Sequence, residues 1–342
     1  MPTPRSVPAA LLGCTNLRIV AASLVAAVFA CSDGRSGGAG GAGAAGGTAD
    51  VIAVYNAGSL SRPLRAALDT FAARTGARIE QESAGSLETA RKLTELGKIP
   101  DVVALADYQV FPQLLIPRHV TWYVQFARNR MVLAHTPRAR GAAEIDSTNW
   151  WRIVQRPDVE MGRADPNLDP NGYRTLLVMQ LAERHYGERG LYDRLVAAAP
   201  RENVRPKEAD LVALLQAGEL DYAWSYESLA QSTGLQYVVL PAAIDLSDPT
   251  LGDVYTHAEV RVLGGAPGDT LTFRGEPIVY GLSIPTAAPH PATAERFVAF
   301  LLSADGQRVL RGAKLDALTS PVLVGSGAPE AVRQFATGGS RP

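Results

Sequence analysis

Short apolar runs alternate with amphipathic runs along residues 51–107. The run VIAVY is apolar and β-branched, which predicts a buried strand. In the following SRPLRAALDTFAARTG, Leu64, Leu68 and Phe71 recur at helical spacing, and Gly76 is a typical helix end. RIEQES and DVVALAD are two more strand-like runs, separated by the helix-like run LETARKLTELG. This order of strands and helices predicts an α/β fold with a mostly parallel, helix-covered sheet.

The rest of the chain continues to mix strand-like and helix-like runs. TWYVQFARNRMVLAH (residues 121–135) is long, aromatic and alternating, which indicates a pair of strands or a strand that crosses between two domains. Helices are expected in DPNGYRTLLVMQLAERHYG, EADLVALLQAG and PATAERFVAFLLSADGQRVL, where Ser303 is expected to cap a second helical piece. Strands are expected in DYAWSYES, LQYVVLP and PIVYGLSIP.

Composition excludes several classes of function for this chain. The chain has 342 residues, which is enough for two domains, and its formal net charge of -1 indicates no basic field for nucleic acid. Both cysteines, Cys14 and Cys31, precede the expected folded region, so neither a disulfide framework nor a cysteine-based zinc site is available to it.

The N-terminal segment reads as a targeting signal. Residues 19–30 are apolar but short for a membrane-spanning helix, and Cys31 follows the small residue Ala30. Residues 1–30 are therefore expected to be a lipoprotein signal peptide, with Cys31 as the lipid attachment site. A plain signal peptide or a membrane anchor are the alternatives. Residues 31–49 are glycine-rich and are expected to tether a body that starts near Asp50.

Two matched corners follow the first two strands. NAGSLS holds Gly58 and Ser59, and SAGSLE holds Ser86. Each corner joins a strand to a helix N-terminus, where backbone N–H groups are free and the helix dipole favours anions. In a parallel sheet both corners lie on the rim where such sheets bind ligands. DPNGYR, which begins at Asp169, offers a third such terminus. The alternative is that these residues are only helix caps.

Eight runs between residues 51 and about 321 resemble the periplasmic molybdate/tungstate-binding proteins of ABC transporters, in particular the tungstate/molybdate-binding branch. These runs are YNAGSLSRP, ESAGSLETARKLTEL, PDVVALADY, DPNLDPNGYRTLLVMQLAE, GELDYAWSYESLA, GLQYVVLPAAIDLSD, GEPIVYGLSIP and FVAFLLSADGQRVL. The resemblance implies a two-lobed type II periplasmic binding protein fold that closes on a ligand in a cleft. Lobe I is expected at 50–129 with a C-terminal return at about 281–335, and lobe II at 130–280.

The resemblance also implies the ligand contacts. Donors at the serine corners and two carboxylates would complete a six-coordinate Mo or W centre. The expected oxyanion-binding residues are Gly58, Ser59, Ser86, Asp169, Pro170, Asn171, Glu227 and Tyr237. Asp169 is matched to the first carboxylate and Glu227 to the second, while Asn171 stands where the family often has cysteine. Sulfate and phosphate would only be repelled by such carboxylates, whereas a large hexavalent metal centre can accept two more hard oxygen ligands.

The expected protein is thus a non-enzymatic, monomeric lipoprotein on the periplasmic or outer face of the cytoplasmic membrane. It would have no cofactor and would pass molybdate or tungstate to an ABC permease and its ATPase. The alternatives are a binding protein for sulfate or ferric ion, the latter using tyrosines such as Tyr222 and Tyr226, or an extracytoplasmic enzyme. The five histidines show no zinc-hydrolase spacing, and nucleophile-elbow and P-loop motifs do not occur in the body.

Overall fold

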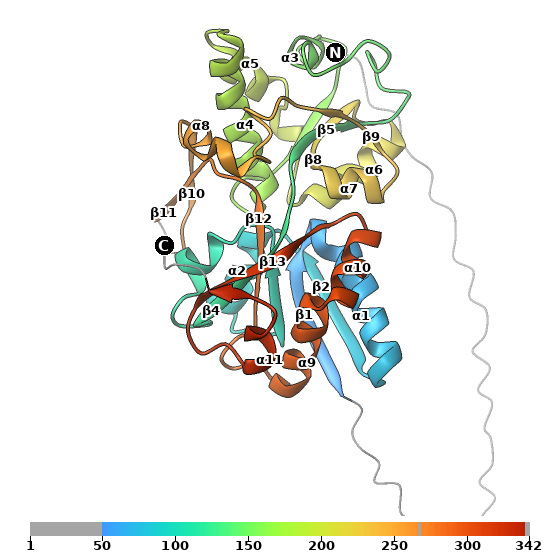
Figure 1. Ribbon diagram of the computed structural model, residues 1–342. Helices are drawn as coiled ribbons and strands as arrows, with labels where there is room; N and C mark the ends of the chain where they lie inside the picture. The colour runs from blue at the N-terminus through green and yellow to red at the C-terminus, as the bar shows by residue number, and fades with distance from the viewer. Residues whose placement is uncertain (1–49, 266–267, 339–342) are drawn as a thin grey trace, which may run out of the picture. The chain divides into compact units, whose positions relative to one another are not determined.

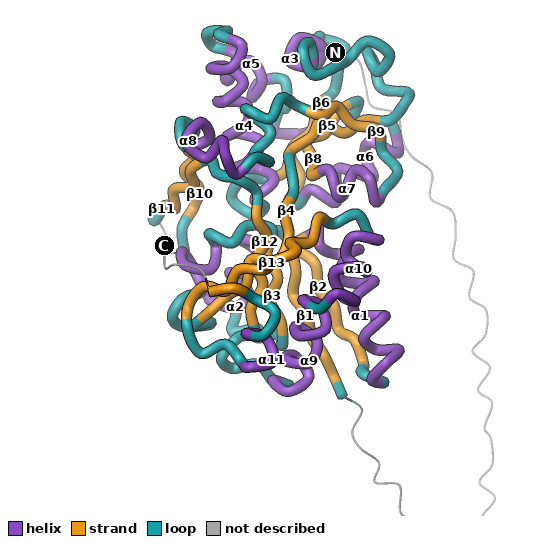
Figure 2. Tube along the Cα trace, in the orientation of Figure 1, coloured by secondary structure: helices purple, strands orange, loops and turns teal. Residues whose placement is uncertain are grey.

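The computed structural model describes residues 50–265 and 268–338. The expected signal peptide, Cys31 and the glycine-rich tether lie outside the described residues. The described chain forms a mixed α/β structure of two lobes, each built around a sheet (Figures 1 and 2).

Seven described strands form the sheet of the first lobe, in the order β14-β13-β4-β12-β3-β1-β2. They are β1 (Val51–Ala57), β2 (Arg78–Ala84), β3 (Val102–Leu105), β4 (Trp122–Arg128), β12 (Val279–Ser283), β13 (Asp316–Gly325) and β14 (Thr337–Gly338). Strand β1 is parallel to β2 and β3, but β12 is antiparallel to β3 and β4, and β13 is antiparallel to β4. The prediction of a mostly parallel sheet therefore holds for β1, β2 and β3 and for the edge pair of β13 and β14. It is wrong for the pairs that β12 and β4 form, because β12 enters this sheet from the other lobe without a crossover helix.

The helices of this lobe are α1 (Ser61–Thr75), α2 (Ser86–Thr94), α9 (Pro291–Leu302), α10 (Ala304–Gly312) and α11 (Glu330–Arg333), and Phe111–Leu115 form a π-helical turn. Helices α1, α9 and α10 pack together, and the rings of Phe71 and Phe297 meet edge to face with 5.4 Å between centroids. The Ser303 side chain accepts a hydrogen bond from the Gly306 N–H, which confirms the predicted cap. The N- and C-terminal parts of the described chain thus share one lobe.

Five described strands form the sheet of the second lobe, in the order β7-β6-β8-β5-β9. They are β5 (Met131–His135), β6 (Met161–Ala164), β7 (Val204–Arg205), β8 (Tyr222–Tyr226) and β9 (Gln236–Val239). The helices are α3 (Trp150–Ile153), α4 (Pro170–Tyr186), α5 (Leu191–Ala197), α6 (Glu208–Ala217), α7 (Glu227–Ser232) and α8 (Gly252–Tyr255). Short 3-10 turns occur at Gly58–Leu60, Arg201–Asn203 and Pro249–Leu251, and β10 (Glu259–Leu263) pairs with β11 (Thr270–Arg274) as a ribbon.

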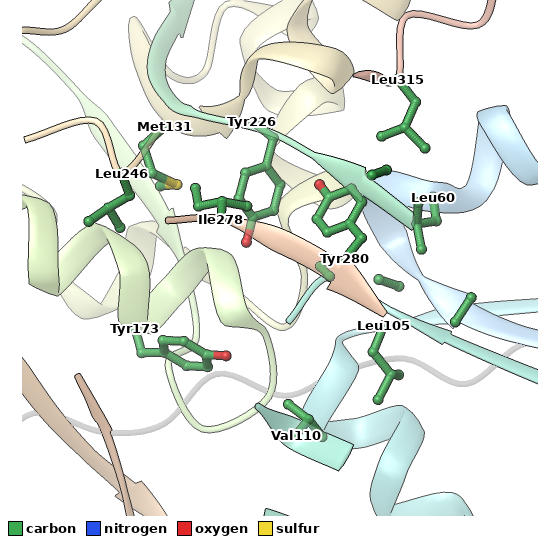
Figure 3. Packing of buried hydrophobic residues seen from close by; sticks show 14 of the residues in the cluster. Leu60, Leu105, Val110, Met131, Tyr173, Tyr226, Leu246, Ile278, Tyr280 and Leu315 are labelled. Carbon is green, nitrogen blue, oxygen red and sulfur yellow. The ribbon is translucent and has the colours of Figure 1, made fainter. Parts of the chain in front are cut away.

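Asn129 and Arg130 carry the chain from one sheet to the other, because β4 ends at Arg128 and β5 begins at Met131. Of the two predictions for residues 121–135, the structure therefore shows two strands, which belong to different lobes. The main hydrophobic core continues through this region, and Figure 3 shows Leu60 and Leu105 of the first lobe in the same cluster as Met131 and Leu246 of the second. Of the helices described, none is both long and apolar enough to cross a membrane.

Candidate functional site

Four segments that follow paired strand ends carry the candidate site. In the first lobe, Ala57 at the end of β1 is in register with Ala84 at the end of β2, so the two serine corners begin side by side. The second lobe repeats this arrangement, because Ala164 of β6 is in register with Arg205 of the parallel strand β7. The segments after β6 and β7 lead into α4 and α6. Each lobe thus presents two neighbouring helix N-termini at one edge of its sheet.

The corner at Gly85 lies against the segment that precedes α4. The backbone N–H groups of Leu87 and Glu88 both donate to the carbonyl oxygen of Leu168, at 3.1 and 3.3 Å. A Cβ atom at position 85 would lie 2.2 Å from that oxygen and 3.2 Å from the Cα of Asp169. Glycine is therefore required here by the close approach of the two lobes.

The corner at Gly58 lies against the start of α6. A Cβ atom at position 58 would lie 3.6 Å from the Cβ of Ala209 and 4.0 Å from that of Lys207, the two neighbours of Glu208. Each serine corner of the first lobe is therefore matched by one acidic helix start of the second lobe: Ser86 by Asp169 and Ser59 by Glu208.

Asp169 caps helix α4 and also contacts α6. Its Oδ1 accepts a hydrogen bond from the Asn171 N–H at 2.9 Å, and its Oδ2 accepts one from the Glu208 N–H at 3.0 Å. The side chain is almost fully buried, and burial raises the pKa of this carboxyl from 3.8 to about 6, against the backbone hydrogen bonds and the nearby charge of Arg174. Asp169 thus caps α4 and also connects it to the first turn of α6.

Glu208 is the second buried carboxylate. Its Oε1 accepts hydrogen bonds from the Ser225 hydroxyl at 2.7 Å and from the Tyr226 N–H at 2.5 Å. Its Oε2 is buried and has no hydrogen-bond partner among the described residues. Burial, followed by the charge of Asp169, raises the pKa of Glu208 well above its usual range. A buried carboxylate oxygen without a partner is costly, so a ligand is the expected partner.

One buried cation offsets these acids. Arg174, on α4, forms an ion pair with Asp107 of the first lobe at 3.1 Å, and both side chains are nearly inaccessible. Its Nη1 also donates to the Ala106 carbonyl at 2.6 Å and to the Tyr226 hydroxyl at 2.8 Å. The guanidinium group thus joins the two lobes beside the carboxylates.

Both predicted serines are buried, and each accepts a hydrogen bond from the protein. The Ser86 hydroxyl accepts from the Ala106 N–H at 2.9 Å, and the Ser59 hydroxyl accepts from the Tyr280 phenol at 3.1 Å. Since a hydroxyl carries one proton, each serine keeps that proton free to donate to a ligand.

Pro170 and Asn171 form the first turn of α4, as predicted for the third helix start. The Asn171 side chain is fully buried, and within the described chain neither its amide nitrogen nor its amide oxygen has a hydrogen-bond partner. Its backbone N–H is used by the Asp169 cap. Within the described residues, Asn171 therefore has an unpartnered side-chain amide, whereas its backbone N–H is already bonded.

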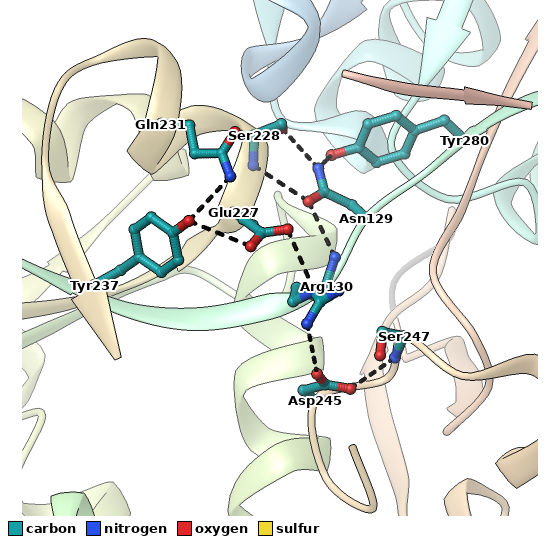
Figure 4. Close-up of polar contacts among 9 residues, drawn as sticks. All are labelled: Asn129, Arg130, Glu227, Ser228, Gln231, Tyr237, Asp245, Ser247 and Tyr280. Carbon is teal, nitrogen blue, oxygen red and sulfur yellow. Dashed lines mark hydrogen bonds and ion pairs between the residues drawn. The ribbon is translucent and has the colours of Figure 1, made fainter. Parts of the chain in front are cut away.

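The structure places Glu227 and Tyr237 in a different network from Asp169. Glu227 begins α7 after β8, forms an ion pair with Arg130 at 3.3 Å, and accepts a hydrogen bond from Tyr237 at 3.3 Å (Figure 4). Its side chain is 26% exposed, whereas Glu208 is buried and bonded to Asp169 through its backbone. The carboxylate beside Asp169 is Glu208, which differs from the expected pairing with Glu227.

A sequence signal for Glu208 exists but is weak. The run VRPKEADL places Glu208 at the first position of α6, shortly after the two residues of β7. An acidic residue in a first helical turn is also an ordinary dipole-stabilising choice, so the pattern by itself does not distinguish a ligand from a cap.

Comparisons with known proteins agree with this architecture. The chain is 42% identical over 291 residues to an uncharacterized solute-binding protein of Petrotoga mobilis, covering 84% of this chain and 91% of the relative. It is 37% identical over 314 residues to the molybdate/tungstate-binding protein WtpA of Pyrococcus abyssi, covering 84% and 89%.

Two solved structures share the fold at low sequence identity. The sulfate-binding protein SubI of Mycobacterium tuberculosis matches with a TM-score of 0.57 at 16% identity, covering 84% of this chain and 90% of the other. The periplasmic molybdate-binding protein of Azotobacter vinelandii matches with a TM-score of 0.57 at 16% identity, covering 77% and 98%. The family described as bacterial extracellular solute-binding protein matches residues 52–313, and the chain belongs to this family.

Proposed function

We propose that this protein binds molybdate or tungstate outside the cytoplasm for import by an ABC transporter. The observation that carries the proposal is the pair of adjoining buried carboxylates, Asp169 and Glu208, opposite two serine corners with free hydroxyl protons. The names of relatives such as WtpA of Pyrococcus abyssi support the same ligand class.

The chemistry of the donor set favours a metal oxyanion over sulfate. Serine hydroxyls and backbone N–H groups stabilise any tetrahedral dianion. Two carboxylates beside sulfate would add only repulsion in a desolvated site. A Mo or W centre can instead accept carboxylate oxygen as a ligand, and the unpartnered Oε2 of Glu208 is the oxygen best placed to become one.

The ferric alternative fits the tyrosines poorly. The Tyr222 hydroxyl donates to the Arg140 carbonyl at 2.8 Å, and the Tyr226 hydroxyl accepts from Arg174. Burial raises the pKa of Tyr222 to about 12 and that of Tyr226 further above its usual range. The Tyr222 hydroxyl is therefore engaged by a backbone carbonyl, and the Arg174 cation at the Tyr226 hydroxyl disfavours a ferric ion there.

Calorimetric titration of the ligand-free protein with tungstate, molybdate, sulfate and phosphate tests the proposal. We expect tight binding of the first two anions and much weaker binding of the others. X-ray absorption of the tungstate complex should show more oxygen neighbours than the four of the free anion. Tight sulfate binding without a response to molybdate or tungstate would refute the proposal.

Capture and release require the lobes to separate. The hydrogen bonds from Leu87 and Glu88 to Leu168 close the edge of the site between Ser86 and Asp169. A membrane-embedded permease with a cytoplasmic ATPase would receive the anion when these bonds break. In this scheme the protein binds and delivers its ligand unchanged, and so it is not an enzyme.

We also propose that Cys31 is lipidated and holds the monomeric body at the outer face of the cytoplasmic membrane. Cys31 follows Ala30 at the end of an apolar run, and a glycine-rich tether follows it. The Cys31→Ser variant should leave the membrane fraction or keep an uncleaved signal. Unchanged fractionation and processing of the variant would contradict the proposal.

A further inference from the structure

A chain of hydrogen bonds leads from the lobe crossing to Ser59. Asn129 lies between β4 and β5, where the polypeptide passes from one sheet to the other, and Tyr280 lies on β12. Figure 4 shows the Asn129 amide between Ser228 of the second lobe and the Tyr280 hydroxyl. All of these groups are buried or half-buried, so their bonds are not freely exchanged with water.

Backbone donors determine the orientation of the Asn129 amide. Its Oδ1 accepts from the Arg130 N–H at 3.0 Å and from the Ser228 N–H at 3.3 Å. Since a backbone N–H can only donate, the amide oxygen must lie on this side. The Nδ2 group therefore lies on the other side, where it donates to the Ser228 hydroxyl at 2.7 Å and to the Tyr280 hydroxyl at 2.8 Å.

The amide in turn determines the direction of the Tyr280 proton. The Tyr280 ring is fully buried, and burial raises its pKa further above the usual tyrosine range, so it stays a neutral phenol. Because its oxygen accepts from Asn129, its single proton is directed to the Ser59 hydroxyl oxygen at 3.1 Å. Ser59 then accepts the Tyr280 proton with a lone pair of its own oxygen, so the Ser59 proton remains free.

We propose that Asn129 and Tyr280 are positioning residues that make the Ser59 hydroxyl an obligate hydrogen-bond donor to the bound oxyanion. This inference rests on the proposed function, because it assigns Ser59 to the ligand. The Ser86 hydroxyl needs no such side chains, since its oxygen already accepts a hydrogen bond from a backbone N–H. Ser59 depends on two side chains that are supplied by the two crossings of the chain between the lobes.

A double-mutant cycle on tungstate affinity tests the proposal. Ser59→Ala removes the donor, and Tyr280→Phe removes the group that orients it; each is expected to weaken binding about 10-fold, as for one lost hydrogen bond. In the Ser59→Ala protein, Tyr280→Phe should have almost no further effect, because the donor is already gone. If the affinity losses of the two single variants multiply in the double variant, the proposal is overturned and Tyr280 acts only on packing.

Asn129→Asp gives an independent test with almost no change of shape. The aspartate oxygen that replaces Nδ2 can only accept, so the Tyr280 proton turns towards it and no longer reaches Ser59. The added negative charge weakens anion binding in both backgrounds, so the affinity loss should be about 10-fold greater in the parent than in the Tyr280→Phe background. An equal loss in both backgrounds would contradict the proton-directing role.

Matched controls separate this role from folding. Tyr255 is also fully buried, and its hydroxyl donates to the Ala242 carbonyl at 2.6 Å in a different network. Tyr255→Phe should reduce stability to urea but leave tungstate affinity unchanged and uncoupled to Ser59→Ala. Parent-like affinity of Ser59→Ala would refute the ligand role of Ser59 itself, whereas a weakened but uncoupled Ser59→Ala refutes only the positioning role.

Discussion

The Oδ2 atom of Asp169 accepts a hydrogen bond of 3.0 Å from the backbone N–H of Glu208. Asp169 therefore contacts the first turns of two helices, α4 through Asn171 and α6 through Glu208. This single bond brings two acids together that are 39 residues apart in the chain. Burial is the main cause that raises the pKa of both carboxyls, and the charge of Asp169 raises the pKa of Glu208 further.

Replacement of Glu208 should weaken binding far more than replacement of Glu227. Glu208→Gln keeps the shape but removes a buried carboxylate ligand, and we expect tungstate affinity to fall roughly 100-fold, as for the loss of a strong interaction with a charged group. Glu227→Gln changes a half-buried ion pair with Arg130 and should alter affinity only slightly. Calorimetry on both variants gives the comparison, and the reverse ranking would restore Glu227 as the second ligand.

The stability of the ligand-free protein should fall as pH rises from about 4 to about 6. Asp169 has a pKa of about 6 when folded, against an ordinary 3.8, so over this interval the folded state holds a proton that the unfolded state has lost. The free energy of unfolding therefore decreases through this window by about 3 kcal/mol and then levels off for this group. The raised pKa of Glu208 extends the decrease to higher pH.

Urea unfolding of the parent and of the Asp169→Asn/Glu208→Gln double variant between pH 4 and 8 measures this effect. The difference between the two profiles isolates these acids from carboxyls whose pKa is lowered, such as Asp221 and Asp305. We expect the free energy of unfolding of the double variant to increase relative to that of the parent as pH rises. Parallel profiles would mean that neither carboxyl is protonated more readily in the folded state.

Gly85→Ala should prevent the lobes from closing without unfolding them. The added methyl group would lie 2.2 Å from the Leu168 carbonyl oxygen, although the backbone at this position, with φ -63° and ψ 150°, suits alanine. We expect tungstate affinity to fall at least about 10-fold, since the hydrogen bonds from Leu87 and Glu88 to the Leu168 carbonyl no longer form. Gly312→Ala is the control, because its methyl group meets no described atom within 4 Å. Equal affinities of the two variants would show that this approach is not needed for binding.

Arg174→Met should be strongly destabilising. It leaves Asp107, which is 1% exposed, as a buried charge without its cation, and such losses amount to about 3–5 kcal/mol. Arg74→Met breaks an ion pair with Asp305 in which the side chains are 53% and 46% exposed, and should change stability by less than about 1 kcal/mol. Urea midpoints of the two variants make the test, and similar values would mean that the Asp107 contact carries little stability.

The sequence by itself determined the local elements that build the site. Alternating apolar and helical runs indicated β1, α1, β2, α2 and β3 in order, and the glycine after each of the first two strands marked the corners at Ser59 and Ser86. Asp169 before Pro170 marked the start of α4. These features depend on neighbours in the chain, on strand periodicity, capping and turn chemistry, so they could be read without a structure.

Only the tertiary structure decided which carboxylate joins Asp169. Glu208 and Glu227 both begin a helix after a strand, and local sequence treats them alike. The strand order β7-β6-β8-β5-β9 and the register of β7 beside β6 bring Glu208 to Asp169, while Glu227 follows β8 and lies with Arg130. Strand β7 has two residues, too few for a periodic pattern.

Local sequence likewise did not predict the antiparallel strand pairs of the first sheet or the hydrogen bonds that orient the Ser59 hydroxyl. Strand β12 pairs with β3 and β4 only after the chain has passed through the second lobe, and Tyr280 meets Ser59 across 221 positions of sequence. Such contacts depend on how whole lobes pack and on where their polar groups find partners. A pattern read over a dozen neighbouring residues holds no information about a partner so far along the chain.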